Sequence, residues 1–306
     1  MSWAQVCYEY DGTFDGFLTC VFESYANHEE AVCFQGPEAS SHTLWETRRV
    51  DADRGKALRV FRSMEPKIGR GAADLVYRAF LTCLDEKELH IYRFLRYGYQ
   101  RGQAAMRDLG DDRVNTLNKA VQHLNAEAHL YKGFVRVSDY DGVLIGEIEP
   151  KNRVLPLLRS HFTGRYNTEC FLLYDRTHRE ALVYGPCRWA IVPLEGDSLP
   201  PVGAEELHYR RLWRRFYDTI ALEGRYNPKL RQTHMPKRYW NVMTEFQEDP
   251  VSAPPQNAGG AHTGENLNLF RVDAQCPAQV HDGVERSAAD PPGQEGHQRA
   301  VRDVGL

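Results

Sequence analysis

The spacing of large apolar residues changes along this 306-residue chain, and that change constrains the fold more than any other feature. Between about residues 53 and 127 such residues recur every three or four positions, as they do on the buried face of a helix. Between about residues 133 and 193 they lie in short runs bounded by turn residues, which is typical of strands. The sequence therefore predicts an α+β fold, in which a helical cluster packs with a mainly antiparallel sheet.

Helix starts in the first half are predicted from capping residues. The Asp15 carboxylate is positioned to accept the free N–H groups of a helix that begins there. Asp85 and Glu88 have the spacing of a capping box and predict another helix start. A helix over 54–64 is expected to end before Pro66, because a proline crowds the backbone of the residue that precedes it. Further elements are expected over residues 7–10 and 31–34 (strands), 72–84 and 114–124 (helices).

The second half is predicted to contain two hairpins. Residues 139–142 form a turn between two apolar runs, and Asp175 and His178 are expected in a second turn. A helix over 153–162 lies between the hairpins, with Pro156 in its first turn, where a missing N–H is tolerated. The strands are expected over residues 134–137, 143–148, 171–174, 181–184 and 189–192.

The composition changes after Phe246, and this change sets the expected domain boundary. Residues 247–306 have few large apolar side chains and many Pro, Gly, Ala, Gln and Asp residues, so we expect a disordered tail. A helix over 205–222 has one apolar stripe, and Gly224 is expected to end it. The stripe consists of Tyr209, Leu212, Phe216 and Ile220. We expect residues 1–246 to form a single domain, with a helical part (about 53–127), a sheet part (about 133–193) and a basic helical part (about 204–246).

The cysteines and the hydropathy indicate a reducing compartment. The seven cysteines are odd in number, widely scattered and free of any CxxC pair, so the sequence predicts no disulfide framework and no cysteine-rich metal site. We expect reduced, mostly buried thiols. No basic segment followed by an apolar run opens the chain, and no stretch approaches the roughly 20 apolar residues of a membrane span. A soluble, cytoplasmic protein without membrane contact is expected.

Positive charge gathers in residues 208–240, although the whole chain has a formal net charge of −4. Only Asp218 and Glu223 oppose nine cations there, and aromatic residues such as Tyr239 and Trp240 lie among them. Arginines four apart on a helix repel one another, and a phosphate backbone relieves that repulsion. Neighbouring rings can stack on unpaired bases. This cationic segment therefore predicts a nucleic-acid surface. Its cations are Arg210, Arg211, Arg214, Arg215, Arg225, Lys229, Arg231, Lys237 and Arg238.

An alternative interpretation assigns the same arginines to a solvated, ion-paired face. In that case the carboxylates of residues such as Asp51, Glu127 or Glu149 neutralise the cations, and several of the aromatic residues belong to the core. The two interpretations differ in whether the cations meet at an open surface or disperse into ion pairs.

Histidine is the best candidate for catalysis. The chain has no CxxxCxxC cluster, GxxxxGK[ST] loop, GxSxG elbow or HExxH motif, and we predict neither a cofactor nor a metal. His161 with Arg165 can manage proton transfer and phosphate charge. His123 and Glu127 share a helical face that His129 does not. The alternative is that His161 and His129 are hydrogen-bonded packing residues or phosphate contacts.

Four stretches together carry a family resemblance: YEYDGTFDGFLTCVFESY, HLYKGFVRV, the run from IEPKN through HFTGRY to LLYDRTHREALVYG, and RRLWRRFYDTIALEGRYNPKLRQTHMPKRYW. Over about residues 6–246 the chain resembles a bacterial family of uncharacterised DNA metabolism or DNA repair proteins, a domain of unknown function. The resemblance implies a radical SAM protein, encoded nearby, as partner. Some members are fused to a uracil-DNA glycosylase-like domain, and residues 247–306 do not resemble one.

The resemblance also implies functional positions. Val137 departs from the family pattern, which has an aromatic residue after Arg136. The positions that match the family's motifs are His129, Lys132, Arg136, His161, Arg165, Arg214, Tyr217, Arg225, Asn227, Pro236, Lys237 and Trp240.

Three functions follow as hypotheses. The first is a DNA-binding accessory module, not itself an enzyme, that delivers single-stranded or damaged DNA to the radical SAM protein. The second is a hydrolase or lyase acting on nucleic acid, with His161 and Arg165 as catalytic residues. The third is a protein-binding subunit that docks an acidic partner. The nucleic-acid-binding residues of the first hypothesis are Lys132, Arg136, Arg211, Arg214, Arg215, Tyr217, Arg225, Asn227, Lys229, Lys237, Arg238, Tyr239 and Trp240.

Overall fold

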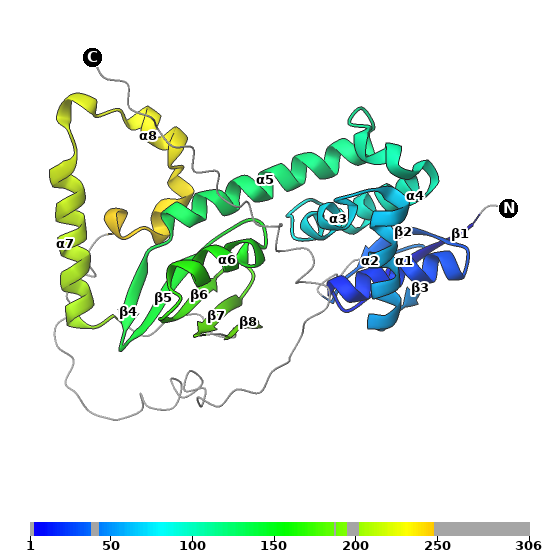
Figure 1. Ribbon diagram of the computed structural model, residues 1–306, viewed down its shortest axis with the longest axis horizontal. Coiled ribbons are helices and arrows are strands. Elements are labelled where there is room, and N and C mark those ends of the chain that lie inside the picture. Colours follow the sequence, from blue (N-terminus) through cyan, green and yellow to red (C-terminus); the bar gives the residue numbers. More distant parts are fainter. Residues whose placement is uncertain (1–2, 38–42, 187, 195–201, 248–306) are drawn as a thin grey trace, which may run out of the picture. The chain divides into compact units, whose positions relative to one another are not determined.

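The computed structural model describes residues 3–37, 43–186, 188–194 and 202–247 (Figure 1). Helices and two sheets are both present, which confirms the α+β class. The chain divides into two compact units, one from residues 1–126 with 152–156 and the other centred on residues 127–151 and 157–247. The expected disordered tail lies outside the described residues, apart from Gln247, and the single domain expected for residues 1–246 stays a prediction.

The first unit contains a three-stranded parallel sheet in the order β2-β1-β3. Parallel neighbours need a crossover, and helix α1 (Phe14–Ala26) provides it between β1 (Ala4–Glu9) and β2 (Glu29–Gln35). The central strand buries Val6, Cys7 and Tyr8. The sequence did not predict β3 (Glu46–Arg49), because its four polar or charged residues show no apolar alternation.

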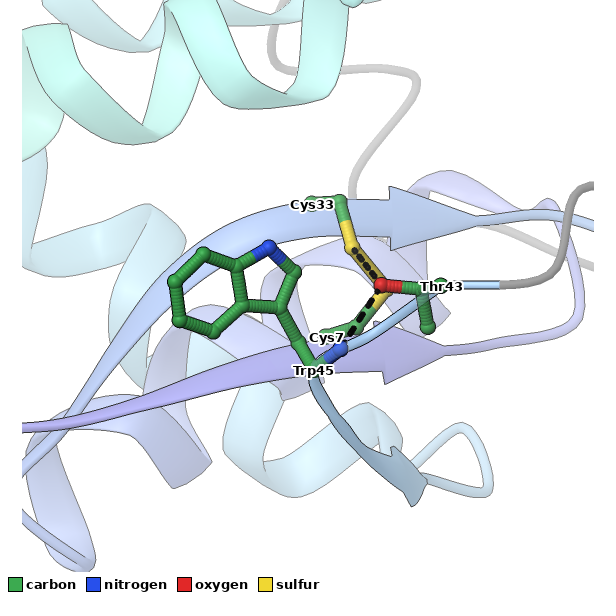
Figure 2. The surroundings of a disulfide bond; sticks show 4 residues. All are labelled: Cys7, Cys33, Thr43 and Trp45. Atoms are coloured by element: carbon green, nitrogen blue, oxygen red, sulfur yellow. Dashed lines mark hydrogen bonds between the residues drawn. A yellow bond between two sulfur atoms is a disulfide. The ribbon is translucent and has the colours of Figure 1, made fainter.

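A disulfide joins β1 to β2, and it corrects the expectation that the cysteines are all reduced. Cys7 and Cys33 face each other in the register of the two strands, with their Cα atoms 4.7 Å apart (Figure 2). Thr43 Oγ1 lies 3.9 Å from Cys33 Sγ and accepts a hydrogen bond of 3.2 Å from the Trp45 N–H. Strand pairing, which the sequence spacing does not reveal, brings the two sulfur atoms together. Among the described residues, Cys20, Cys83 and Cys170 are free thiols.

Helices surround this sheet, and their ends differ from the prediction at three places. Thr13, not Asp15, caps α1 by accepting the Gly16 N–H. Helix α2 (Arg54–Ile68) continues through Pro66, whose missing N–H falls in the last turn and removes one bond. Glu86, in the left-handed region at φ 48°, precedes α4 without a side-chain cap, so the capping box was wrong. The remaining helices here are α3 (Ala72–Phe80), α4 (Lys87–Arg101), η1 (Gly102–Arg107) and the first part of α5 (Asp112–Phe134).

The second unit contains a five-stranded sheet in the order β4-β5-β6-β7-β8. Three of its four pairings are antiparallel, which confirms the mainly antiparallel sheet, and β5 pairs with β6 in parallel across α6 (Leu155–Arg165). The first strand begins at Val137 because α5 continues to Phe134, so the strand expected over 134–137 was wrong. The strands are β4 (Val137–Tyr140), β5 (Val143–Ile148), β6 (Cys170–Asp175), β7 (Glu180–Gly185) and β8 (Arg188–Pro193).

The turns and the core of this sheet follow from local chemistry. Asp141 and Gly142 have φ of 51° and 87°, the conformation of a tight hairpin turn. Asp175 accepts the Thr177 and His178 N–H groups at 3.0 and 3.1 Å, which confirms the second turn. Ile145, Leu172, Tyr174 and Ala181 form a buried cluster on the sheet. Among the described residues, no helix has both the length and the apolar character needed to cross a membrane.

Candidate nucleic-acid interface

The cationic segment folds into short helices that follow one long one. Helix α7 (Ala204–Ile220) ends four residues before Gly224, the residue expected to end it. Asn227 caps α8 by accepting the Leu230 N–H at 3.0 Å, and Pro228 follows as the first helical residue. The structure thus gives Asn227, expected to bind nucleic acid, a capping role. The segment comprises α7, η2 (Glu223–Arg225), α8 (Pro228–His234) and η3 (Lys237–Val242), and η4 (Thr244–Phe246) follows it.

Arg136 and Glu245 form an ion pair that fixes η4 beside the end of α5. Arg136 Nη2 lies 2.6 Å from Glu245 Oε1, and Arg136 Nε lies 3.1 Å from Glu245 Oε2. Trp213 of α7 donates its Nε1–H to the same carboxylate at 3.1 Å. The Glu245 side chain is 1% exposed and that of Arg136 is 25% exposed, so this pair is largely shielded from water. Arg136, expected to hold a phosphate, is neutralised by a carboxylate of its own chain.

Arg238 is neutralised in the same way. Its Nη2 lies 3.0 Å from Oε1 of Glu127, whose side chain is 1% exposed, and the Lys151 N–H donates to the same oxygen at 3.1 Å. Here the alternative interpretation of the sequence is correct, because Glu127 was one of its proposed partners. The adjacent Tyr239 is fully buried, with its ring 5.0 Å from that of Tyr131. This burial corrects the expectation for Tyr239, since its ring has no open face for a base.

Trp240 and Tyr217 belong to an aromatic cluster in which both rings contact Phe246. The rings of Trp240 and Phe246 are stacked at 4.4 Å, and Tyr217 meets Phe246 edge-on at 5.8 Å. The Arg231 guanidinium lies 5.1 Å from the centre of the Trp240 ring and 5.6 Å from that of Phe246. Trp240 also donates Nε1–H to the Met235 carbonyl at 3.0 Å. Phe246 therefore occupies one face of the proposed stacking residue Trp240.

Two further arginines of α7 have partners within the unit. Arg210 donates to Glu206 at 3.1 Å and to Ser138 of β4 at 2.6 Å. Arg214 donates to the Gln247 carbonyl at 2.8 Å. These contacts place one side of α7 against β4 and η4, so Arg210 and Arg214 help to hold the helix.

Four exposed cations of the segment lack a charged partner among the described residues. The side chains of Arg215, Arg225, Lys229 and Lys237 have no charged partner among the described residues, and Arg211 is also exposed. We call Arg215, Arg225, Lys229 and Lys237 the exposed cation set. Lys237 Nζ lies 5.9 Å from the centre of the Trp240 ring. Exposed rings accompany this set, with Tyr226 70% exposed and Phe216 53% exposed.

The catalytic candidates His161 and Arg165 lie on α6, and Lys132 of α5 lies near them. His161 Nε2 is buried and has no hydrogen-bond partner among the described residues. Burial lowers the pKa of His161, and the charges of Lys132 and Arg165 lower it further, against a hydrogen bond to the Lys132 backbone. The imidazole is therefore neutral near neutral pH. The structure thus brings together three of the residues named from the sequence.

The other histidine candidates do not join this cluster. His123 Nδ1 lies 3.3 Å from the Asn152 side chain, and Glu127, on the same helix, turns to Arg238. His129 is exposed. In the described part of the chain, no three His, Cys, Asp or Glu side chains are grouped as a metal site requires.

The sequence did not indicate the residues that contact Arg136 and Trp240. Glu245 and Phe246 hold Arg136 and Trp240 in place, yet both lie just beyond the cationic segment. One negative charge and one ring in the 244–246 stretch were the only signals that could have indicated them.

The family described as a domain of unknown function, DUF4130, matches residues 85–245. The match covers more than half of the 306 residues, and the chain therefore belongs to this family. It includes every stretch that carried the resemblance except the opening one. No curated protein matches the chain.

Proposed function

We propose that this protein is a nucleic-acid-binding accessory protein of DNA metabolism. The observation that carries the proposal is the exposed cation set, whose four side chains take part in none of the ion pairs observed in the segment. Phosphates of single-stranded or damaged DNA supply the missing negative charge and release counterions on binding. Exposed rings such as Phe216 and Tyr226 add surfaces on which unpaired bases stack.

The binding surface excludes some of the residues first expected there. Arg136 and Arg238 already satisfy nearly buried carboxylates, so a phosphate would have to displace Glu245 or Glu127. The proposed contacts are therefore the exposed cation set, together with exposed Lys132 and Arg165 on α5 and α6.

Salt dependence of binding tests this proposal. Affinity for a single-stranded oligonucleotide is expected to fall with salt by a log–log slope of roughly −0.7 per phosphate contact. Replacing Arg225, Lys229 and Lys237 together by Ala is expected to flatten the slope by about 2, because three contacts are lost. Fluorescence anisotropy over a salt series measures both.

A matched control separates the surface from net charge alone. Arg62, Arg70 and Lys119 are also exposed cations, lie in the other unit and have no charged partner among the described residues. Their triple Ala variant has the same net charge as the test variant and is expected to keep the wild-type slope. Equal slopes for the two triple variants, or salt-insensitive binding, contradict the proposal.

The proposed protein partner is the radical SAM protein that the family resemblance implies. In this role the chain delivers DNA to an enzyme and does not catalyse a reaction itself. Co-purification with and without nuclease distinguishes a complex bridged by DNA from direct docking. A nuclease-resistant complex, with a chain that ignores DNA, would favour the protein-binding subunit that docks an acidic surface.

A hydrolase or lyase centred on His161 is a second candidate, and one observation favours it. The buried Nε2 of His161 has no partner among the described residues, and a neutral imidazole beside Lys132 and Arg165 can accept a proton near a phosphate. Nicked, abasic and uracil-bearing oligonucleotides, with and without a divalent metal, are the test substrates. Turnover that is lost in His161→Ala while binding is retained supports this candidate, and no turnover on any substrate opposes it.

A further inference from the structure

Helix α7 exposes an apolar face. Tyr209, Leu212, Phe216 and Ile220 are spaced by three or four residues, so they line one side of the helix, which we call the α7 ridge. Each is between 47% and 57% exposed, and no described residue of α7 is buried. The opposite side of the helix carries Arg210 and Arg214, which bind β4 and Gln247.

The concentration of exposed apolar residues is unusual for this chain. Of the twelve large apolar residues that are exposed in the described part, eight lie between Tyr209 and Leu230. Contiguous apolar surface of this kind marks an interaction site, whereas single exposed residues need no explanation. The adjacent Arg215 is exposed and adds positive charge along the ridge. An occupant is therefore expected to combine apolar side chains with negative charge.

The chain itself contains a segment with that composition. Residues 248–306, outside the described residues, carry nine acidic and four basic side chains, a formal charge of −5. Their densest group of large apolar residues is Leu267, Leu269 and Phe270, with Glu265 before it and Arg271 and Asp273 after it, so residues 265–273 have a formal charge of −1. This apolar group, in a segment with a net negative charge, matches an apolar ridge bordered by Arg215.

The same chain outside the described residues starts beside α7. The Gln247 carbonyl accepts a hydrogen bond from Arg214, in the middle of the helix, at 2.8 Å. The connection from there to residue 265 can extend to about 60 Å, whereas α7 is only about 25 Å long. The connection is therefore long enough for residues 265–273 to reach any part of α7, and it gives the segment an effective concentration on the order of millimolar.

A second copy of the chain fits the ridge less well. Two ridges placed face to face would bring the arginines of one α7 close to those of the other, and like charges at short distance oppose pairing. We propose that residues 265–273 of the same chain cover the α7 ridge, with Leu267, Leu269 and Phe270 on the apolar side chains and an acidic residue beside Arg215. This inference does not rest on the proposed nucleic-acid binding, and because both use Arg215 and Phe216, the segment and DNA would compete for this part of α7.

Photo-cross-linking in the full chain tests the inference without any nucleic acid. The photoreactive residue p-benzoylphenylalanine replaces Phe216, and in a control it replaces exposed Asp218 on the other side of α7. After irradiation, mass spectrometry identifies the joined peptides. We expect monomeric chains in which position 216 is joined to a peptide containing 265–273, and loss of most of this product at the control position.

A variant of the segment completes the test. Leu267→Asp, Leu269→Asp and Phe270→Asp together leave the described residues unchanged and are expected to reduce the cross-link at least about tenfold, which corresponds to about 1.4 kcal/mol. A covalent dimer, a cross-link to residues 3–126, an equal yield from position 218, or no product at all overturns the inference. Circular dichroism confirms that both labelled chains are folded before any yield is compared.

Discussion

The pair between Arg136 and Glu245 gives the sharpest test of the structure, because it predicts unequal effects for its two partners. Arg136→Ala removes the charged partner of Glu245, whose side chain is 1% exposed in the intact pair, and leaves it only the Trp213 Nε1–H among its observed contacts. Breaking a fully buried pair costs about 3–5 kcal/mol, and exposed pairs contribute about 0–1 kcal/mol. Since Arg136 is 25% exposed, water can enter when it is removed. We expect a loss of about 2–4 kcal/mol in the free energy of unfolding.

Glu245→Ala is expected to cost less, about 1–2 kcal/mol, because the stranded Arg136 keeps its hydrogen bond to the Gly133 carbonyl (2.9 Å) and reaches water. The double variant is expected to lose less than the sum of the two single losses, by about 1–3 kcal/mol. Urea unfolding followed by far-ultraviolet circular dichroism measures all three values, and avoids the fluorescence of Trp213, which contacts the pair.

A control from the same unit fixes the scale of the effect. Arg176 lies 3.2 Å from Glu149, but these side chains are 47% and 32% exposed, so Arg176→Ala is expected to cost less than about 1 kcal/mol. If Arg136→Ala costs no more than Arg176→Ala, or if the double variant equals the sum of the single variants, the description of this pair as buried and coupled is wrong.

Two further predictions concern stability. Folding lowers the pKa of His161 from 6.5, so the unfolded chain binds more protons below that value. Stability is therefore expected to fall as the pH drops through 6.5. His161→Gln should reduce the difference between the urea midpoints measured at about pH 5 and about pH 7.5. Gly98→Ala is expected to destabilise the first unit by about 1–3 kcal/mol, since the new Cβ would lie 2.8 Å from Ile68 Cγ2 in the core, and a drop in the urea midpoint would reveal it. An exposed substitution such as Gly133→Ala, where the new Cβ meets nothing within 4 Å, serves as its control.

Periodicity predicted the elements well, because hydrophobic spacing is a local property. The switch from helical to strand spacing located the helices of the first unit and four of the five strands of the second, while the hairpin turn at Asp141 and Gly142 follows from turn chemistry alone. The errors lie at element ends and in pairing. Thr13 and Asp15 are both good caps, and only the backbone at Thr13 decides between them. Cys7 and Cys33 meet through strand register, to which their separation of 26 residues gives no clue.

Charge could be counted from the sequence but not assigned to partners. Arg136 and Glu245 are 109 residues apart, and Arg238 and Glu127 are 111 apart, so no local pattern separates these arginines from Arg215 or Arg225. Folding removes some cations of the segment from the surface and leaves others on it. The sequence likewise predicted the helical period of the apolar stripe of α7, but it did not show that this face stays exposed. Helix α7 exposes both an apolar ridge and the charge of Arg215, so a segment or partner that covers it must supply apolar side chains and negative charge.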